Sequence, residues 1–276
     1  MTALLGLTAE PVAEPGEGVV RVTVLGTLTV RHAGEVVRIP AQSRWLLGLL
    51  ALRANSVVAL DEIVAVIWPA DPPRAYRERL HTYVARLRRP LGSGPVNVQW
   101  CGNGYELVAG PDSLDVLEFA ANAATGDAKS AVGDRRDAAH WYGRALDLWK
   151  GQLLGGTDGR LDNRPEAVQL NRHRVTTCLR FADLAARCGL QQRAVDALSA
   201  VCHAEPLDEA VHGRLMSALA DVGRRADALT VFHGLRARLV DELGVEPGAE
   251  VTRVFRELLD GRSARDSSWV RGTVVQ

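Results

Sequence analysis

Arginine is concentrated in one short stretch, PPRAYRERLHTYVARLRRPL, which runs from Pro72 to Leu91. Between Pro73 and Arg89 this stretch holds six arginines and a single acidic residue, a net charge of +5. Such a density of like charges is unfavourable unless an anionic partner neutralises it. The planar guanidinium group suits such a partner, because it can grip a phosphate or the O6/N7 edge of guanine with two hydrogen bonds. The stretch is therefore a candidate nucleic-acid-binding element.

The same stretch has the periodicity of an amphipathic helix. Its apolar face consists of residues at three- and four-residue steps: Tyr76, Leu80, Tyr83, Val84, Leu87 and Leu91. Its polar face, on the opposite side, consists of Arg79, Thr82, Arg86 and Arg89, with Arg77 and Arg88 on the flanks. We expect the helix to begin with Pro73 near its first turn.

A helix of this kind divides its polar side chains between bases and phosphates. The residues expected to contact base edges are Arg79, Thr82 and Arg86. The residues expected to contact phosphates are Arg44, Arg77, Arg88 and Arg89. Glu78 can accept a hydrogen bond from a cytosine amino group or tune the charge of its neighbours, and His81 is either a phosphate contact or simply exposed. The alternative is a basic face that only solvent touches, and the surrounding elements must decide between the two.

The charges of the whole chain are unevenly distributed, although the 276 residues have zero net charge. Residues 20–110 carry eleven basic and six acidic side chains, whereas residues 111–276 have a net charge of −2. A basic N-terminal part joined to a slightly acidic C-terminal part favours a nucleic-acid binder with an appended regulatory domain. The composition, 47% hydrophobic and 24% charged, is that of a globular protein, and the length allows two domains.

The elements before the basic helix begin at Val20, after a Pro-, Gly- and Glu-containing segment 1–19 that we expect to be a flexible tail. Alternating valines predict a strand that continues beyond Gly26, and a turn at Ala33-Gly34 leads into a short return strand over 36–39. A helix should follow through about Arg53, with Ser43 as its N-terminal cap.

A second helix should run from Asp61 to about Trp68, and the basic helix follows a proline-rich turn. Past the basic helix, alternating residues over 96–100 and 105–108 flank Gly102-Asn103-Gly104 and predict a second hairpin. Strands, two helices, a basic helix and a hairpin make a winged helix-turn-helix. In that fold the third helix enters the major groove and the hairpin, or wing, contacts the neighbouring backbone.

Four tracts make the comparison more specific: VTVLGTLTVRHAG, LLALRANSVVALDEIVAVIW, HTYVARLRR and GYEL. They resemble the OmpR/PhoB type of winged helix, in the version found in the Streptomyces antibiotic regulatory protein family. Leu80, Val84 and the RLRR tract 86–89 match that family's third helix. Tyr83 stands where the family usually has His, and Pro90 replaces a helix former, so we expect the helix to end or kink slightly early.

The second half of the chain is predicted to be helical, since apolar residues recur at helical spacing in seven segments: 115–124, 136–149, 166–188, 193–204, 209–222, 225–243 and 249–259. The tracts QQRAVDAL and GRRADAL are offset by 31 to 32 residues, near the ~34-residue tetratricopeptide period. Segment 151–165 is glycine-rich, and we assign it no structure. The fold class is thus an α+β winged helix-turn-helix followed by an all-α tetratricopeptide-like repeat domain.

The tracts ALDLWKG, HAEPLDEAVHGRLMSALADVGRRADAL and DELGVEPGAE resemble the bacterial transcriptional activation domain of the same family. The resemblance implies a DNA-binding domain over 20–110, an activation domain over 111–260 and a flexible tail over 261–276. It also implies an activator of a secondary-metabolite gene cluster that recruits RNA polymerase holoenzyme. As a homodimer or head-to-tail dimer it would bind direct repeats in double-stranded DNA, with half-sites ~10–11 bp apart.

Motifs of catalysis, cofactor binding and metal binding are missing from the sequence, which holds no GxxxxGK[ST], HExxH, GxSxG or GxGxxG and no CxxC pair. We therefore expect no enzyme activity, no cofactor and no metal, and interpret Cys202, His203 and His212 as packing or surface residues. No receiver precedes the winged helix, so we expect no control by an attached phosphorylated receiver. Without a signal peptide or membrane span, we place the protein in the cytoplasm, at the nucleoid. The alternative function is a tetratricopeptide-like adaptor for proteins or ligands that does not bind specific DNA.

Overall fold

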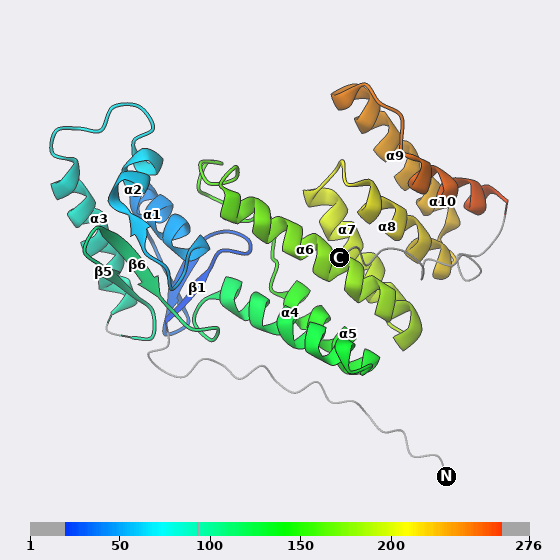
Figure 1. Ribbon diagram of the computed structural model, residues 1–276, viewed down its shortest axis with the longest axis horizontal. Coiled ribbons are helices and arrows are strands. Elements are labelled where there is room, and N and C mark those ends of the chain that lie inside the picture. Colours follow the sequence, from blue (N-terminus) through cyan, green and yellow to red (C-terminus); the bar gives the residue numbers. More distant parts are fainter. Residues whose placement is uncertain (1–19, 93, 261–276) are drawn as a thin grey trace, which may run out of the picture.

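The computed structural model describes residues 20–92 and 94–260, so the tails predicted over 1–19 and 261–276 lie outside the described residues. A mixed α/β part with two small sheets is followed by a series of helices, which extends toward the right of Figure 1. The predicted fold class is confirmed. None of the helices in the described part of the chain combines the length and apolar character that a membrane crossing requires.

The first sheet is antiparallel and has three strands, β1 (Val20–Thr23), β2 (Thr29–His32) and β3 (Glu35–Val37). Val22 of β1 lies opposite Val30 of β2, and Val30 lies opposite Val37 of β3. The predicted alternation is seen in β1, where Val20 and Val22 are buried and the residues between them are partly exposed. One face of this sheet therefore contributes to the core.

Three helices follow: α1 (Ala41–Leu52), α2 (Leu60–Ile67) and α3 (Tyr76–Leu91). The prediction that Ser43 caps α1 is wrong, because Pro40 occupies the cap position and no side chain there accepts a hydrogen bond. Ser43 lies in the first turn and is buried, and its hydroxyl donates to the backbone carbonyl of Tyr83 at 3.4 Å. Ser43 thus joins α1 to α3.

The wing consists of β5 (Asn97–Trp100) and β6 (Gly104–Val108), and a short third strand, β4 (Val58–Ala59), pairs with β6 to give the order β4-β6-β5. Glycine at position 104 permits this third strand. A Cβ atom there would lie 2.0 Å from the carbonyl oxygen of Val58, which is closer than any van der Waals contact. The segment that links α1 to α2 therefore pairs with β6 and adds a third strand to the wing.

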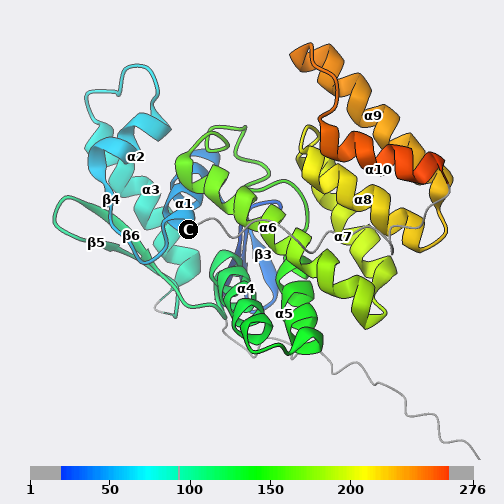
Figure 2. The same ribbon diagram turned by 45° about the vertical axis from the view of Figure 1, so that its right-hand side comes forward.

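Seven helices form the rest of the described chain, and consecutive helices pack in pairs from α4 to α9, with α10 returning against α8 and α9 (Figure 2). They are α4 (Asp115–Ala131), α5 (Arg135–Asp147), α6 (Pro165–Cys188), α7 (Gln191–Ala204), α8 (Glu209–Asp221), α9 (Arg225–Leu243) and α10 (Ala249–Leu259). This is the tetratricopeptide-like arrangement predicted, in which each helix buries an apolar face on its neighbours.

The expected end of α4 at Ala124 is wrong, since the helix continues to Ala131. Gly126 does not break it but lies against the ring of Tyr142 on α5, where a Cβ atom would be only 2.6 Å from the ring. The hydroxyl of Tyr142 in turn donates to Asp127 at 2.6 Å. The glycine therefore serves close packing of two helices.

Segment 151–165, to which we assigned no structure, completes the first of two hydrophobic cores. That core takes in buried residues between Val20 and Ala167, including Leu153, Leu154 and Leu161, whereas the second lies between Ala138 and Leu258. The segment also hydrogen-bonds to the link between β1 and β2, where Leu154 N–H donates to the carbonyl of Val24 at 2.8 Å. The helical part of the chain thus closes the core of the winged part.

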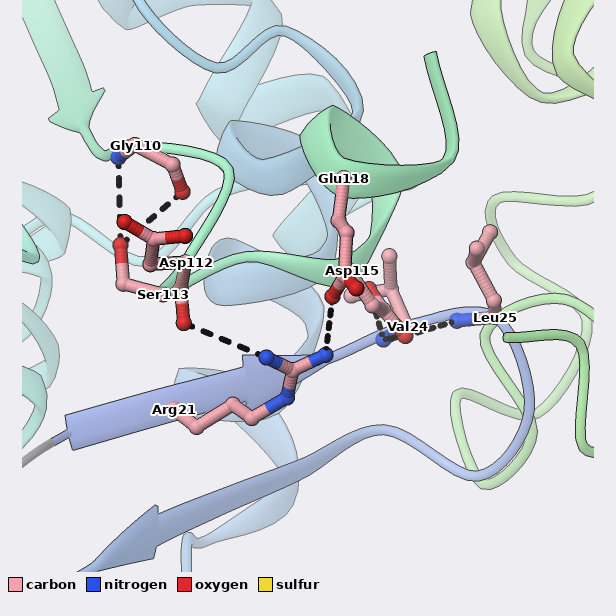
Figure 3. Close-up of polar contacts among 8 residues, drawn as sticks. All are labelled: Arg21, Val24, Leu25, Gly110, Asp112, Ser113, Asp115 and Glu118. Atoms are coloured by element: carbon pink, nitrogen blue, oxygen red, sulfur yellow. Dashed lines mark hydrogen bonds and ion pairs between the residues drawn. The ribbon is translucent and has the colours of Figure 1, made fainter. Parts of the chain in front are cut away.

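A buried carboxylate makes the second link between the two parts (Figure 3). The N–H groups of Val24 and Leu25 donate to the carboxylate of Asp115, at the start of α4, at 2.9 Å. Beside it, Arg21 of β1 forms an ion pair with Glu118 at 2.5 Å and donates to the carbonyl of Asp112 at 3.2 Å. Burial raises the pKa of Asp115 from 3.8 to about 6, against the hydrogen bonds and the Arg21 charge, which lower it.

The raised pKa of Asp115 predicts a specific pH dependence of stability. The folded protein holds the Asp115 proton more tightly than the unfolded chain does. Protonation of Asp115 therefore stabilises the fold most below pH ~4, and this stabilisation is lost as the pH rises through about 6. The unfolding free energy of the wild type, minus that of Asp115→Asn, should increase by about 2–3 kcal/mol between pH 7 and pH 4. Urea denaturation of both proteins at several pH values measures this difference, and a constant difference would contradict the assignment.

Candidate nucleic-acid interface

Helix α3 fixes the candidate interface through its apolar face. Leu80, Val84, Leu87 and Leu91 are buried, and the helix packs against α1, β2 and β5. The helix begins at Tyr76. Pro73, expected near the first turn, lies just before it in a separate turn, which Tyr76 N–H closes by donating to the Pro73 carbonyl.

Helix α3 does not end early at Pro90, which was one of the two effects expected of this proline. Pro90 lies inside the last turn, the helix continues to Leu91, and Gly92 N–H donates to the carbonyl of Arg88 at 2.9 Å. So close to the C-terminus, proline removes only its own hydrogen bond to the preceding turn. A hydrogen bond of 3.0 Å joins its carbonyl to His32 Nδ1 and holds the end of α3 beside β2.

Three aromatic side chains orient the N-terminal half of α3. The indole ring of Trp68, directly after α2, lies 6.4 Å from the ring of Tyr76 and 6.0 Å from that of Tyr83. Both tyrosines belong to the predicted apolar face and are partly buried. Because aromatic contacts of this kind are directional, they fix the rotation of α3 about its axis and thus the direction of its polar face.

The polar face of α3 is exposed and unneutralised. The exposed side chains include those predicted to contact bases or phosphates from this helix: Arg77, Glu78, Arg79, His81, Thr82, Arg86, Arg88 and Arg89. Among residues 20–92 and 94–260, the ion pairs found involve no arginine of α3. Elsewhere arginines commonly pair, as Arg193 does with Asp147 at 2.9 Å and Arg236 with Glu246 at 2.6 Å. The structure therefore gathers these charges on one surface and gives them no protein counter-ion.

Two of the α3 arginines have local partners nonetheless. Arg77 Nε donates to the hydroxyl of Tyr76 at 3.2 Å, at the start of the helix. Arg88 Nε donates to the carbonyl of Val98 in β5 at 2.8 Å, so this side chain ties the helix to the wing. The sequence offered no signal for the second bond, because the acceptor is a backbone atom ten residues away.

Arg44 lies apart from this pattern. It is half-buried in the first turn of α1, and its terminal nitrogens donate to the carbonyls of Gly156 at 3.0 Å and Ile39 at 3.2 Å. Arg44 thus helps to hold segment 151–165 against the winged part.

The wing differs from the helix in having no cationic side chain between Gly92 and Tyr105. Trp100, 49% exposed, packs edge-on against Tyr105 at 5.0 Å. The turn is attached to α2 by Leu60 N–H, which donates to the carbonyl of Asn103 at 3.0 Å. A phosphate at this wing would have to be held by uncharged donors, such as side-chain amides, backbone N–H groups and the indole N–H of Trp100.

No group of three His, Cys, Asp or Glu in the described part of the chain is arranged to hold a metal ion, and all four cysteines are free. His212 is buried with Nδ1 2.8 Å from the carbonyl of Asp208, His203 is exposed, and Cys202 is buried. Burial raises the pKa of the Cys202 thiol to about 12, which makes this thiol unreactive.

Residues 114–259 match the family model described as the bacterial transcriptional activator domain. The regulatory protein DnrI of Streptomyces peucetius is 30% identical over 249 residues, which are 87% of this chain and 92% of DnrI. The regulatory protein AfsR of Streptomyces coelicolor is 31% identical over 255 residues, which are 92% of this chain but 26% of AfsR. The chain thus spans about a quarter of the length of AfsR.

The fold also has a counterpart among solved structures. The structure of EmbR from Mycobacterium tuberculosis, solved in complex with a low-affinity phosphopeptide, superimposes with a TM-score of 0.70 at 24% identity. The match covers 88% of this chain and 65% of the EmbR chain. The similarity supports the architecture described above, from the winged part through the helical repeats.

The bond from Arg88 to Val98 predicts that Arg88 stabilises the fold, unlike its neighbour. Arg88→Ala should lower the free energy of unfolding by about 0.5–1.5 kcal/mol, because a hydrogen bond between helix and wing is lost. Arg89→Ala serves as the matched control, since Arg89 is exposed and lies in the last turn of the same helix. Urea denaturation of the three proteins measures the effect, and equal stability of both variants would argue against a positioning role for Arg88.

Proposed function

Because the chain belongs to the Streptomyces antibiotic regulatory protein family of bacterial transcriptional regulators, we propose that it activates a secondary-metabolite gene cluster by binding specific DNA sites. The family consists of transcriptional activators and not of enzymes. In this proposal residues 20–110 bind double-stranded DNA, and residues 111–260 are the activation domain that recruits RNA polymerase holoenzyme.

The observation that carries the proposal is the unneutralised arginine face of α3. A helix with this charge, rigidly packed on one side and exposed on the other, has the width and polarity to enter the major groove. The regulators DnrI and AfsR, to which the chain is similar, both come from Streptomyces. This supports a target among antibiotic or other secondary-metabolite genes.

The individual roles follow from position on the helix. Arg79, Thr82 and Arg86 lie on the outermost face, and we assign them to base edges. Thr82 already donates its hydroxyl hydrogen to the carbonyl of Glu78, so its oxygen remains as an acceptor. Glu78 is suited to a cytosine amino group, and His81 to a phosphate.

The phosphate contacts are assigned to Arg77, Arg88 and Arg89 at the edges of the α3 face and to Arg44 in the first turn of α1. Arg88 donates one of its five N–H groups to the carbonyl of Val98, and Arg44 donates two to the carbonyls of Gly156 and Ile39. Both keep further donors for a phosphate. Since contacts of this kind position the protein without specifying sequence, they are separable from base contacts by mutation.

Arg86→Ala should relax the sequence preference and weaken binding to the preferred site by about 1–3 kcal/mol, because a base contact is lost. Arg89→Ala should weaken all sites alike and reduce the slope of log K against log salt by about one phosphate, or ~0.9. Genome-wide footprinting, followed by salt titration on the best site, measures both effects. Arg187→Ala, at an exposed arginine on α6, should leave both quantities unchanged. Absence of protected DNA at low salt would overturn the proposal in favour of the adaptor function.

Direct repeats predict a dependence on spacing. If two copies bind head to tail with half-sites ~10–11 bp apart, inserting about half a helical turn between the half-sites places the second copy on the opposite side of the duplex. Cooperative binding should then disappear, and inserting a full turn should restore it in part. Gel-shift titration of the three DNA fragments measures this. Equal binding to all three would show that the copies bind independently.

A further inference from the structure

A cleft of about 950 Å³ opens between the chain segment after α5 and helices α6 and α7. Its lining includes Trp149 and Lys150 from that segment, Arg174 from α6 and Glu205 just beyond α7. A smaller hollow of about 260 Å³ adjoins it and shares Trp149, Lys150, Arg174 and Ala200 with it. The larger volume is at the upper end of the range of small-molecule sites, roughly 300–1,000 Å³.

Arg174, from the middle of α6, is a buried cation that borders both hollows. Only 6% of this residue is exposed, and its guanidinium carbon lies 4.5 Å from the centre of the Trp149 ring. Within the described part of the chain, Arg174 donates no hydrogen bond and forms no ion pair, and its Nε is fully buried without a partner. Burial lowers the pKa of Arg174, which expresses how unfavourable this charge is in its surroundings.

The indole of Trp149, on which Arg174 stacks, also has a buried N–H group without an acceptor. Only 8% of Trp149 is exposed. A buried donor without a partner is unfavourable, and more so when the donor is charged. Trp149 and Arg174 therefore bring an indole and a guanidinium group without hydrogen-bonded acceptors to the wall of the cleft.

We propose that this cleft binds a small organic anion, whose single carboxylate or sulfonate group is held by the guanidinium group of Arg174, which stacks on the indole of Trp149. The remaining lining suits an apolar body, since Leu153, Ala204 and Pro206 contribute carbon surface. The acidic side chains Asp162 and Glu205 also line the cleft, and Glu205 is the carboxylate that acts electrostatically on Arg174. With Lys150 and Arg174 they bring the formal charge of the lining to zero, so we expect a ligand with one anionic group, at the Arg174 end.

The position of the cleft gives such a ligand access to the winged part. Lys150, in its wall, donates its backbone N–H to the carbonyl of Leu25 at 2.7 Å, next to the Asp115 carboxylate. A ligand therefore contacts the segment that completes the first core, some distance from the DNA-binding face of α3. This site goes beyond the proposed DNA binding and stands on different residues.

Two fluorescent probes of nearly the same shape test the proposal on the full chain: anilinonaphthalene sulfonate, an organic monoanion, and uncharged phenylnaphthylamine. The wild type should bind the sulfonate with one-to-one stoichiometry. Arg174→Met should weaken that binding by about tenfold or more, because a charge-assisted hydrogen bond is lost. Its affinity for phenylnaphthylamine should be unchanged. Arg172→Met, at an exposed arginine on the same helix, is the matched control and should bind both probes as the wild type does.

Equal affinity of wild type and Arg174→Met for the sulfonate would overturn the proposal, as would a wild type that binds the uncharged probe equally well. Hydrogen–deuterium exchange of the wild type keeps the test decisive if the variant fails to fold. Protection by the sulfonate at 149–153 and 200–206 supports the site, whereas protection confined to other segments refutes it.

Discussion

The backbone at Val24 and Leu25, where β1 leaves the first sheet, depends on partners from the distant helical part. Both N–H groups donate to the buried Asp115 carboxylate, and both carbonyls accept from the N–H groups of Leu154 and Lys150. Four buried polar groups are thus satisfied by residues about 90 to 130 positions later in the chain. Because burying unpaired backbone groups is energetically unfavourable, the winged part needs the helical part to complete its fold.

The attachment of the helical part to the winged part leaves the arginine face of α3 uncovered. An ion-pair network of Arg53, Glu62, Arg164 and Glu166 joins the end of α1 and the start of α2 to α6, and adds to the shared core. Helix α3 then lies at the opposite end of the molecule from α9 and α10 in both views (Figures 1 and 2). The helices that pair their own arginines with acids therefore do not cover the arginines of α3.

Sequence patterns predicted the features that depend on local periodicity. The helices, both hairpins and the buried face of α3 all appear, because apolar residues at the correct spacing must face a core. The errors concern residues whose role depends on a tertiary partner. Ser43 was expected to cap α1 but contacts α3, and the stripe predicted over 115–124 stops short of Gly126, which packs on α5. The contact of Asp115 with Val24 had no signal in the sequence. The placement of Arg44 and Arg88 also required coordinates, since both donate to backbone carbonyls.

The arginines without protein counter-ions fall into two classes with different physical consequences. Those of α3 are exposed, so water screens their mutual repulsion and the folded state tolerates them without DNA. Arg174 is 6% exposed, so water solvates its charge poorly, and an anion in the cleft adds a partner to the indole of Trp149 and the carboxylate of Glu205. An exposed basic face gains mainly ionic-strength-dependent affinity from its ligand, whereas a buried arginine gains selectivity for charge at a defined point. The same residue type can therefore serve DNA recognition at one end of the chain and recognition of a small anion near its middle.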